Sequence, residues 1–173
     1  MINEKLFLAN QCLAEDLARE LAKRNLRIVF AESCTAGLIS GILAQVPGIS
    51  KWLCGSSVTY MESVKRQWLG VDPEVLRRHT AVSPEVTESM ARAVLERTET
   101  ADFSLAITGH LEPSLSESGA VAFVGLAFRV DQGIQVGSVN RFPLPGNDRL
   151  ERQWSAAQIA LRSAVAYLQG EVD

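Results

Sequence analysis

Apolar side chains recur at helical spacing in two stretches of the chain, and a helix-start motif marks a third helix. In residues 10–24, leucines are four positions apart and alanines lie beside them, which is the pattern of an amphipathic helix. Ser83-Pro84-Glu85 combines an N-cap, a proline at the first helical position and an acid in the first turn, and so predicts a helix to about Arg97. The stretch from Asp148 has one apolar stripe and predicts a last helix, formed by Leu150, Trp154, Ala157, Leu161, Val165 and Leu168.

Shorter apolar runs predict strands between these helices. They lie at residues 26–30, 53–59, 102–107, 119–129 and 134–142, and the last two are joined by a turn at 131–133. Further helices are expected up to about Val46, over residues 61–69 and from Asp72-Pro73. Strands that first alternate with helices and then form a hairpin predict a three-layer α/β/α sandwich with a mixed sheet. We expect a single domain over residues 1–173.

Composition narrows the classes of function. The net charge of −3 and the pI near 5.5 argue against a general nucleic-acid surface. The three cysteines are widely spaced and form no Cys-x-x-Cys pair, so they predict reduced thiols and no zinc site. No apolar run is long enough to span a bilayer. We therefore expect a cytoplasmic protein without a membrane partner.

The segment from Ala31 to Gly37 places small hydroxyls and a thiol between a predicted strand and a predicted helix. Helix N–H groups that lack partners point outward at such a turn, where they favour anions and can lower the pKa of a nucleophile. The alternative is that Ser33 or Thr35 only caps the helix.

Three hydroxyl side chains closely follow predicted strands: Ser33, Tyr60 and Thr108. In open α/β sheets, ligands bind beyond the carboxyl ends of the strands. If the three strands are parallel neighbours, these side chains converge on one cleft.

Several segments, in order, resemble the CinA C-terminal domain, the competence/damage-inducible family that includes stand-alone nicotinamide mononucleotide deamidases. The resemblance covers roughly residues 10–168 and is carried by Ala31-Glu32-Ser33-Cys34-Thr35-Ala36-Gly37, Val46-Pro47-Gly48-Ile49-Ser50, Val58-Thr59-Tyr60 with Lys65, Leu69-Gly70-Val71, His79-Thr80-Ala81-Val82-Ser83, Ile107-Thr108-Gly109 and Ala156-Ala157-Gln158-Ile159-Ala160-Leu161. It implies the three-layer fold, a homodimer, and hydrolysis of a pyridine-nucleotide carboxamide without a metal or cofactor.

The resemblance also implies roles for individual residues. Ser33 attacks the carboxamide carbon, Lys65 accepts and relays the proton, and Tyr60 orients it or helps to transfer it. Substrate contacts are expected from Glu32, Thr35, Thr108, Gly109, Arg149 and Arg152.

Residue by residue, other interpretations remain open. Lys65 taken alone is a solvated lysine paired with Glu62, and Glu32 either holds the turn or orients the lysine. Cys34 is a rival nucleophile, with His110 as its base. His79 reads best as a helix cap or a surface residue.

The chain departs from the family pattern at both elements that could bind a phosphate. A long glycine-rich loop is replaced by residues 110–118, which contain Glu112 and Glu117 and no glycine. Asp148 stands where an arginine is expected, and Arg149 follows it. Ala36 and Met61-Glu62-Ser63 also differ from the family. We therefore expect an amidase with altered substrate or reduced activity; the alternative is a non-catalytic regulatory domain of competence or DNA-damage responses.

Overall fold

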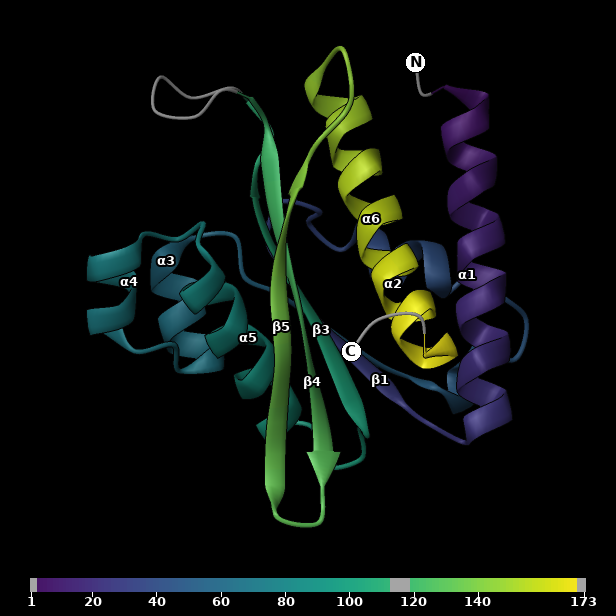
Figure 1. Cartoon of the computed structure of the whole chain (residues 1–173), viewed down its shortest axis with the longest axis horizontal. Helices are drawn as coiled ribbons and strands as arrows, with labels where there is room; N and C mark the ends of the chain where they lie inside the picture. Colours follow the sequence, from purple (N-terminus) through teal and green to yellow (C-terminus); the bar gives the residue numbers. More distant parts are fainter. Residues whose placement is uncertain (1–2, 113–118, 171–173) are drawn as a thin grey trace.

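The computed structural model describes residues 3–112 and 119–170 (Figure 1). A 3-10 turn, η1 (Ile49–Lys51), and a π-helical turn, η2 (Lys65–Leu69), interrupt the regular elements. The helices and strands are α1 (Glu4–Arg24), β1 (Ile28–Glu32), α2 (Leu38–Leu43), β2 (Leu53–Val58), α3 (Glu62–Val64), α4 (Pro73–His79), α5 (Pro84–Glu96), β3 (Phe103–His110), β4 (Val121–Val130), β5 (Gly133–Pro143) and α6 (Arg149–Gln169).

The strands form one sheet in the order β2-β1-β3-β4-β5. β1 is parallel to both β2 and β3, while β4 and β5 form an antiparallel hairpin at the other edge. The predicted mixed sheet is therefore confirmed, and the three strands expected before Ser33, Tyr60 and Thr108 are parallel neighbours. Thr108 itself lies within β3, which continues to His110 rather than ending at residue 107 as expected, because residues 108–110 still pair with β4. The carboxyl ends of the three parallel strands lie at the same edge of the sheet.

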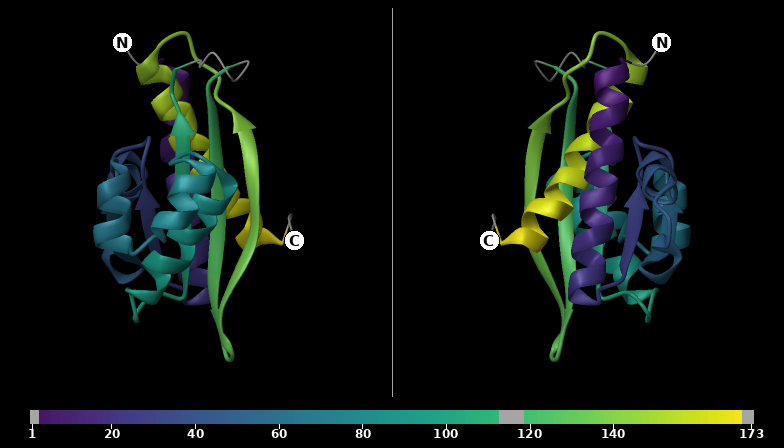
Figure 2. Two further views of the ribbon diagram at one scale, coloured as in Figure 1. Left: turned by 90° about the vertical axis from the view of Figure 1, so that its left-hand side faces the viewer. Right: turned by 90° about the vertical axis from the view of Figure 1, so that its right-hand side faces the viewer.

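Helices cover both faces of this sheet (Figures 1 and 2). α1, α2 and α6 lie on one face, and α3, α4 and α5 lie on the other. Successive residues of β1 alternate between the two cores, since Phe30 packs in the core on the α6 side and Ala31 in the core on the α5 side. All five residues of β1 are buried, as expected for a parallel strand covered on both faces.

Helix caps explain where several elements begin. Asp72, Ser83 and Asp148 are the N-caps of α4, α5 and α6, and the side chain of each accepts a backbone N–H of the first turn. The expected starts of these three helices are thus confirmed. Asp148, which departs from the arginine expected from the resemblance, therefore has a structural role as the N-cap of α6.

Some boundaries differ from the sequence-based expectation. α1 begins at Glu4 rather than near residue 10, because Asn3 caps it and Phe7 packs against Trp154 of α6, with ring centroids 5.6 Å apart. β1 begins at Ile28 rather than 26, since Asn25 ends α1 in the left-handed conformation. None of the described helices is long and apolar enough to cross a membrane.

Candidate functional site

A cavity of about 350 Å³ lies at the carboxyl ends of the three parallel strands. Ser33 follows β1, Tyr60 follows β2, and Gly109 and His110 end β3. The start of α6 and the segment before α5 close its other sides. The described lining residues are Ser33, Cys34, Tyr60, Ala81, Val82, Gly109, His110, Leu111, Glu112 and Arg149.

Thr108 does not line this cavity, although its strand leads to it. Its side chain is fully buried on the α5 side of the sheet, and its hydroxyl forms a 2.8 Å hydrogen bond with that of Thr87. The structure therefore brings Ser33 and Tyr60 to one cavity and places the Thr108 hydroxyl between β3 and α5.

Glu32 holds the turn that carries Ser33. Its fully buried carboxylate accepts the backbone N–H groups of Gly37, Ile39 and Ser40 at 3.0–3.1 Å and the Ser56 hydroxyl at 2.9 Å. The N-terminus of α2 is thus filled by an internal carboxylate. The expectation that free N–H groups of this helix would face a ligand is wrong, and Glu32 acts on the turn rather than on the cavity.

Ser33 and Thr35 do not cap α2, because the N-cap position is held by Gly37, without a side-chain cap. Thr35 is 1% exposed, and its hydroxyl has no hydrogen-bond partner among the described residues. Ser33 is 7% exposed and lines the cavity. The hydroxyl of Ser33 is therefore not committed to helix capping.

Two residues of this turn have a left-handed backbone conformation, which glycine adopts more easily than alanine. Ala36 has φ of 52° and Gly37 has φ of 93°. A residue with a Cβ is destabilised by about 1–2 kcal/mol in the left-handed region. Glycine avoids this cost, but it lowers stability by roughly 0.4–1 kcal/mol because it gives the unfolded chain more conformational freedom. We expect Ala36→Gly to raise the free energy of unfolding by about 0.5 kcal/mol and Gly37→Ala to lower it by about 1 kcal/mol or more.

Urea denaturation of the two variants measures both effects. A Cβ at Gly37 would meet Val58 Cγ2 at 3.5 Å, an ordinary contact, so the loss would report backbone conformation and not a clash. A decrease in stability for Ala36→Gly would show that the turn is not strained.

Lys65 is fully buried, so its interpretation as a solvated lysine is wrong. Its Nζ donates hydrogen bonds to the carbonyl oxygen of Thr59 at 2.8 Å and to Met90 Sδ at 3.5 Å. No salt bridge to Lys65 occurs within the described ranges, and Glu62 exerts only a longer-range attraction. Burial lowers the pKa of Lys65 to about 8, against the opposing influence of Cys34 and Glu62.

The backbone after Tyr60 explains how Lys65 turns inward. Met61 is extended, with ψ of 150°, and the helix begins only at Glu62. It widens into the π-helical turn η2 from Lys65, whose buried face carries Lys65 and Leu69. A regular helix over 61–69, as expected from the sequence, is therefore not observed, and the five-residue separation of Tyr60 and Lys65 does not follow an ideal helical geometry.

Cys34 lies beside Ser33 but has the properties of a core residue. It is 3% exposed, and burial raises the pKa of its thiol to about 12, although the charge of Lys65 opposes this rise. Gly109 lies against it, since a Cβ at Gly109 would be 2.9 Å from Cys34 Sγ and 2.7 Å from a backbone oxygen. A neutral thiol is a weak nucleophile, so the structure disfavours Cys34 as the attacking group.

Tyr60 is 51% exposed at the cavity wall, and its hydroxyl accepts a hydrogen bond from Arg149 Nη2 at 2.6 Å. Arg149 lines the cavity, whereas Arg152 is not among its lining residues. Arg152 instead donates to the carbonyl oxygens of Leu111 and Gly146, at 3.1 and 3.2 Å. Of the two arginines expected to contact substrate, Arg149 is the one among the described lining residues of the cavity.

Within the described residues, Ser33 forms no hydrogen bond with Tyr60 or Lys65. The polar hydrogens of the lysine are directed at Thr59 and Met90, as described above. Lys65 is not among the described lining residues of the cavity, but it is linked to the Ser33 turn through Thr59. The carbonyl oxygen of Thr59 accepts from Lys65, and its N–H donates to the carbonyl oxygen of Glu32, the residue before Ser33, at 2.8 Å. Two hydrogen bonds thus join the buried amine to the strand end that precedes Ser33.

The two histidines occupy different environments. His110 is exposed at the end of β3 and lines the cavity. His79 ends α4, and its Nδ1 lies 3.3 Å from a Glu85 carboxylate oxygen, which agrees with its interpretation as a cap or surface residue. Across residues 3–112 and 119–170, no group of three or more His, Cys, Asp or Glu side chains is arranged to hold a metal ion.

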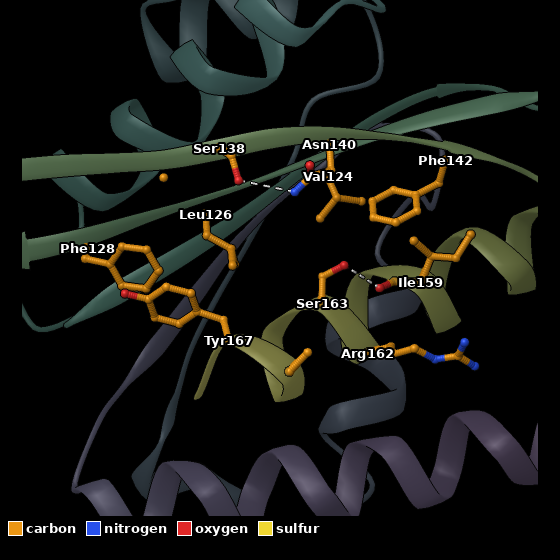
Figure 3. A pocket seen from close by; sticks show the side chains of 12 residues that line it. Val124, Leu126, Phe128, Ser138, Asn140, Phe142, Ile159, Arg162, Ser163 and Tyr167 are labelled. Atoms are coloured by element: carbon orange, nitrogen blue, oxygen red, sulfur yellow. Dashed lines mark hydrogen bonds between the residues drawn. The ribbon is translucent and has the colours of Figure 1, made fainter. Parts of the chain in front are cut away.

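A second cavity, of about 240 Å³, lies between α6 and the β4–β5 hairpin (Figure 3). Its walls are mainly apolar, and Phe128 stacks on Tyr167 with ring centroids 4.0 Å apart. Ser163 donates to the Ile159 carbonyl oxygen, and Asn140 donates to Ser138. Its serines are engaged in these bonds, and its lining comes from β4, β5 and α6 rather than from the carboxyl ends of the parallel strands, where ligands of open α/β sheets bind. We therefore place the chemistry in the Ser33 cavity.

Sequence reasoning missed two residues that shape the site. Met90 accepts from Lys65, and Glu112 faces both Arg149 and Arg152. The helical spacing of α5 indicates that Met90 is buried but not what it contacts. The negative charge of Glu112 was recognised from the sequence, while its pairing was not. Glu117 lies outside the described residues.

Comparisons with known proteins agree with this architecture. The sequence profile of the CinA C-terminal domain matches residues 10–168. A CinA-like protein of Mycobacterium marinum is 37% identical over 165 residues, which are 94% of this chain and 38% of that protein. A CinA-like protein of Myxococcus xanthus is 40% identical over 114 residues, 65% of this chain and 27% of that protein. The chain thus spans about a quarter to two fifths of the length of these relatives.

Solved structures show the same fold. The crystal structure of competence damage-inducible protein A from Klebsiella pneumoniae superposes with a TM-score of 0.83 at 27% identity, covering 92% of this chain and 97% of that one. A competence-damaged protein (CinA) superfamily member from Escherichia coli gives a TM-score of 0.74 at 29% identity, covering 94% and 91%. The chain therefore belongs to the CinA C-terminal domain family.

Proposed function

We propose that this protein hydrolyses the carboxamide of a pyridine nucleotide, as in the conversion of nicotinamide mononucleotide to nicotinate mononucleotide and ammonia, with Ser33 as the nucleophile. The observation that carries the proposal is Lys65. It is a fully buried lysine without a carboxylate partner in the described structure, and its pKa is lowered to about 8. Its amine donates to Thr59, which in turn donates to Glu32, the residue before Ser33. A buried amine that titrates near neutral pH can serve as a general base.

The residues support a two-step reaction. The Ser33 hydroxyl attacks the carboxamide carbon while the neutral amine of Lys65 takes its proton, directly or through one water. The C–N bond then breaks, and ammonia leaves with the proton returned by Lys65. Water, deprotonated by Lys65, next cleaves the acyl ester on Ser33 and releases the carboxylate. Tyr60, whose hydroxyl accepts from Arg149 and which lines the cavity, orients the substrate or transfers a proton in this proposal.

A non-catalytic regulatory domain, linked to competence or DNA-damage responses, is the second candidate. One observation favours it: Glu112 is paired with both arginines of the α6 start, where a phosphorylated substrate would need positive charge. Intact Ser33, Tyr60 and the buried Lys65 favour the enzyme, because a lysine buried without a counter-ion destabilises a domain that has no use for it.

Ammonia release from nicotinamide mononucleotide and from nicotinamide riboside tests the proposal. We expect the purified protein to release ammonia, and to do so undiminished in EDTA, because the proposed groups are a serine and an amine and require no Lewis acid. The matched control is the same assay on the Ser33→Ala variant. Absence of ammonia from both substrates would support the regulatory domain, and activity lost in EDTA and restored by zinc or magnesium would contradict the serine mechanism.

A further inference from the structure

Glu112 lies on the wall of the Ser33 cavity and faces two guanidinium groups at the start of α6. Its Oε1 is 3.7 Å from Arg149 Nη1, and its Oε2 is 3.4 Å from Arg152 Nη1. A carboxylate of the chain itself thus occupies the place between two arginines at which an anionic ligand would bind.

The other hydrogen bonds of the two arginines leave few guanidinium N–H groups free to bind a phosphate. Arg152 is tied to the carbonyl oxygens of Leu111 and Gly146, and its side chain is only 16% exposed. Arg149 is the guanidinium on the described cavity wall, and it is shared between the Tyr60 hydroxyl and Glu112. A phosphate that bound Arg149 in a bidentate manner would have to displace Glu112 and compete with Tyr60.

The sign of the charge at Glu112 also discriminates between ligands. A phosphate monoester is a dianion near neutral pH and is repelled by a carboxylate, whereas a pyridinium ring is a cation and is attracted by one. The Tyr60 ring, half-exposed at the same wall, offers a face for a cation. The cavity volume of about 350 Å³ lies at the lower end of the range of pockets that hold small ligands, about 300–1,000 Å³, which suits a nucleoside.

We propose that Glu112 is a specificity-determining residue that excludes phosphate monoesters, so that the cavity takes a phosphate-free pyridinium nucleoside carboxamide. The proposal rests on the proposed amidase function for the identity of the reacting group. The carboxylate of Glu112 also accepts hydrogen bonds, which suits the hydroxyls of a ribose and not the oxygens of a phosphate.

Calorimetric titration with ribose 5-phosphate tests the anion exclusion without any need for turnover. Glu112→Gln keeps the size of the side chain and removes its charge, and the 59% exposed position makes misfolding a minor concern. We expect this variant to bind ribose 5-phosphate at least tenfold more tightly than the unaltered protein. Glu74→Gln is the matched control, because Glu74 also pairs with two arginines, Arg77 and Arg78, but on α4. Equal affinity of Glu112→Gln and the unaltered protein would overturn the proposal.

Kinetics with both substrates separate this proposal from the proposed function. We expect the unaltered protein to favour nicotinamide riboside over the mononucleotide at least tenfold in kcat/KM, and Glu112→Gln to reduce that preference at least tenfold. Tighter ribose 5-phosphate binding by the variant, with no ammonia from either substrate, would refute the amidase and keep the anion exclusion. Preferred hydrolysis of the mononucleotide by both proteins would keep the amidase and refute the role of Glu112.

Discussion

Replacement of Ser33 by alanine is expected to lower ammonia release by about 10³-fold or more, because the acyl intermediate then has no oxygen on which to form. Ser33 lies on the cavity wall, is spared from helix capping by Gly37, and sits on a turn fixed by the Glu32 carboxylate. A rigid support of this kind keeps a nucleophile in position for attack. The measurement is kcat/KM for ammonia release by the variant and the unaltered protein under the same conditions. Circular dichroism verifies that both proteins are folded.

Cys34→Ala is the matched control for this prediction. The thiol neighbours Ser33 and lines the same cavity, but burial raises its pKa to about 12, so it stays protonated at neutral pH. We expect a loss of about tenfold at most, caused by the cavity left beside Gly109. A larger loss for Cys34→Ala than for Ser33→Ala would transfer the role of nucleophile to the thiol.

The edge of the sheet that carries the site could be predicted from sequence because local signals specify it. Apolar runs at residues 26–30, 53–59 and 102–107 predict strands, and helices between the strands imply parallel connections. Parallel neighbours then bring the following residues together, and Ser33 and Tyr60 do line one cavity. The caps Asp72, Ser83 and Asp148 were equally accessible, since a cap depends on a few adjacent residues.

Contacts between distant segments could not be predicted in this way. Glu32 reads as a polar residue at a turn, and only the fold shows that it accepts three N–H groups of α2 and the Ser56 hydroxyl of β2. Thr108 alternates to the α5 side of β3, where it meets Thr87. Glu112 and Arg149 are far apart in sequence and meet only because the end of β3 lies beside the start of α6.

The burial of Lys65 is the clearest feature that could not be predicted from the sequence, because the sequence alone favours a solvated lysine. The π-helical turn and the packing of Met90 put it inside the protein, where burial lowers its pKa from 10.5 to about 8. Between these pH values the unfolded chain holds a proton that the folded protein has released. The free energy of unfolding is therefore expected to rise as the pH increases from about 8 towards 10.5, while below about pH 8 the cost of the buried ammonium is fully present.

Lys65→Met is therefore expected to raise stability and abolish activity. Methionine fills a similar volume without a charge, and a pKa shift of this size corresponds to a few kcal/mol at 1.36 kcal/mol per unit, part of which is offset by the lost hydrogen bond to Thr59. We expect the free energy of unfolding at pH 7 to increase by about 1–3 kcal/mol, and its rise above pH 8 to disappear. Ammonia release should fall by about 10³-fold or more, since the other buried base at the Ser33 turn, the Glu32 carboxylate, is occupied by four hydrogen bonds.

Lys51→Met, at an exposed lysine of η1, is the matched control, and it should change stability by less than about 0.5 kcal/mol and leave both pH profiles intact.

In the unaltered enzyme, kcat/KM should increase with pH up to about 8 as the Lys65 amine loses its proton. Urea denaturation and ammonia release across pH 6–10 measure these effects on the same three proteins. A Lys65→Met variant that is less stable than the unaltered protein at pH 7 would show that the buried amine contributes to folding. One that keeps the pH-dependent rise in activity would show that another group is the base. The stability gain and the activity loss are expected together, because the burial that makes Lys65 costly to the fold is also what lowers its pKa into the range of a useful base.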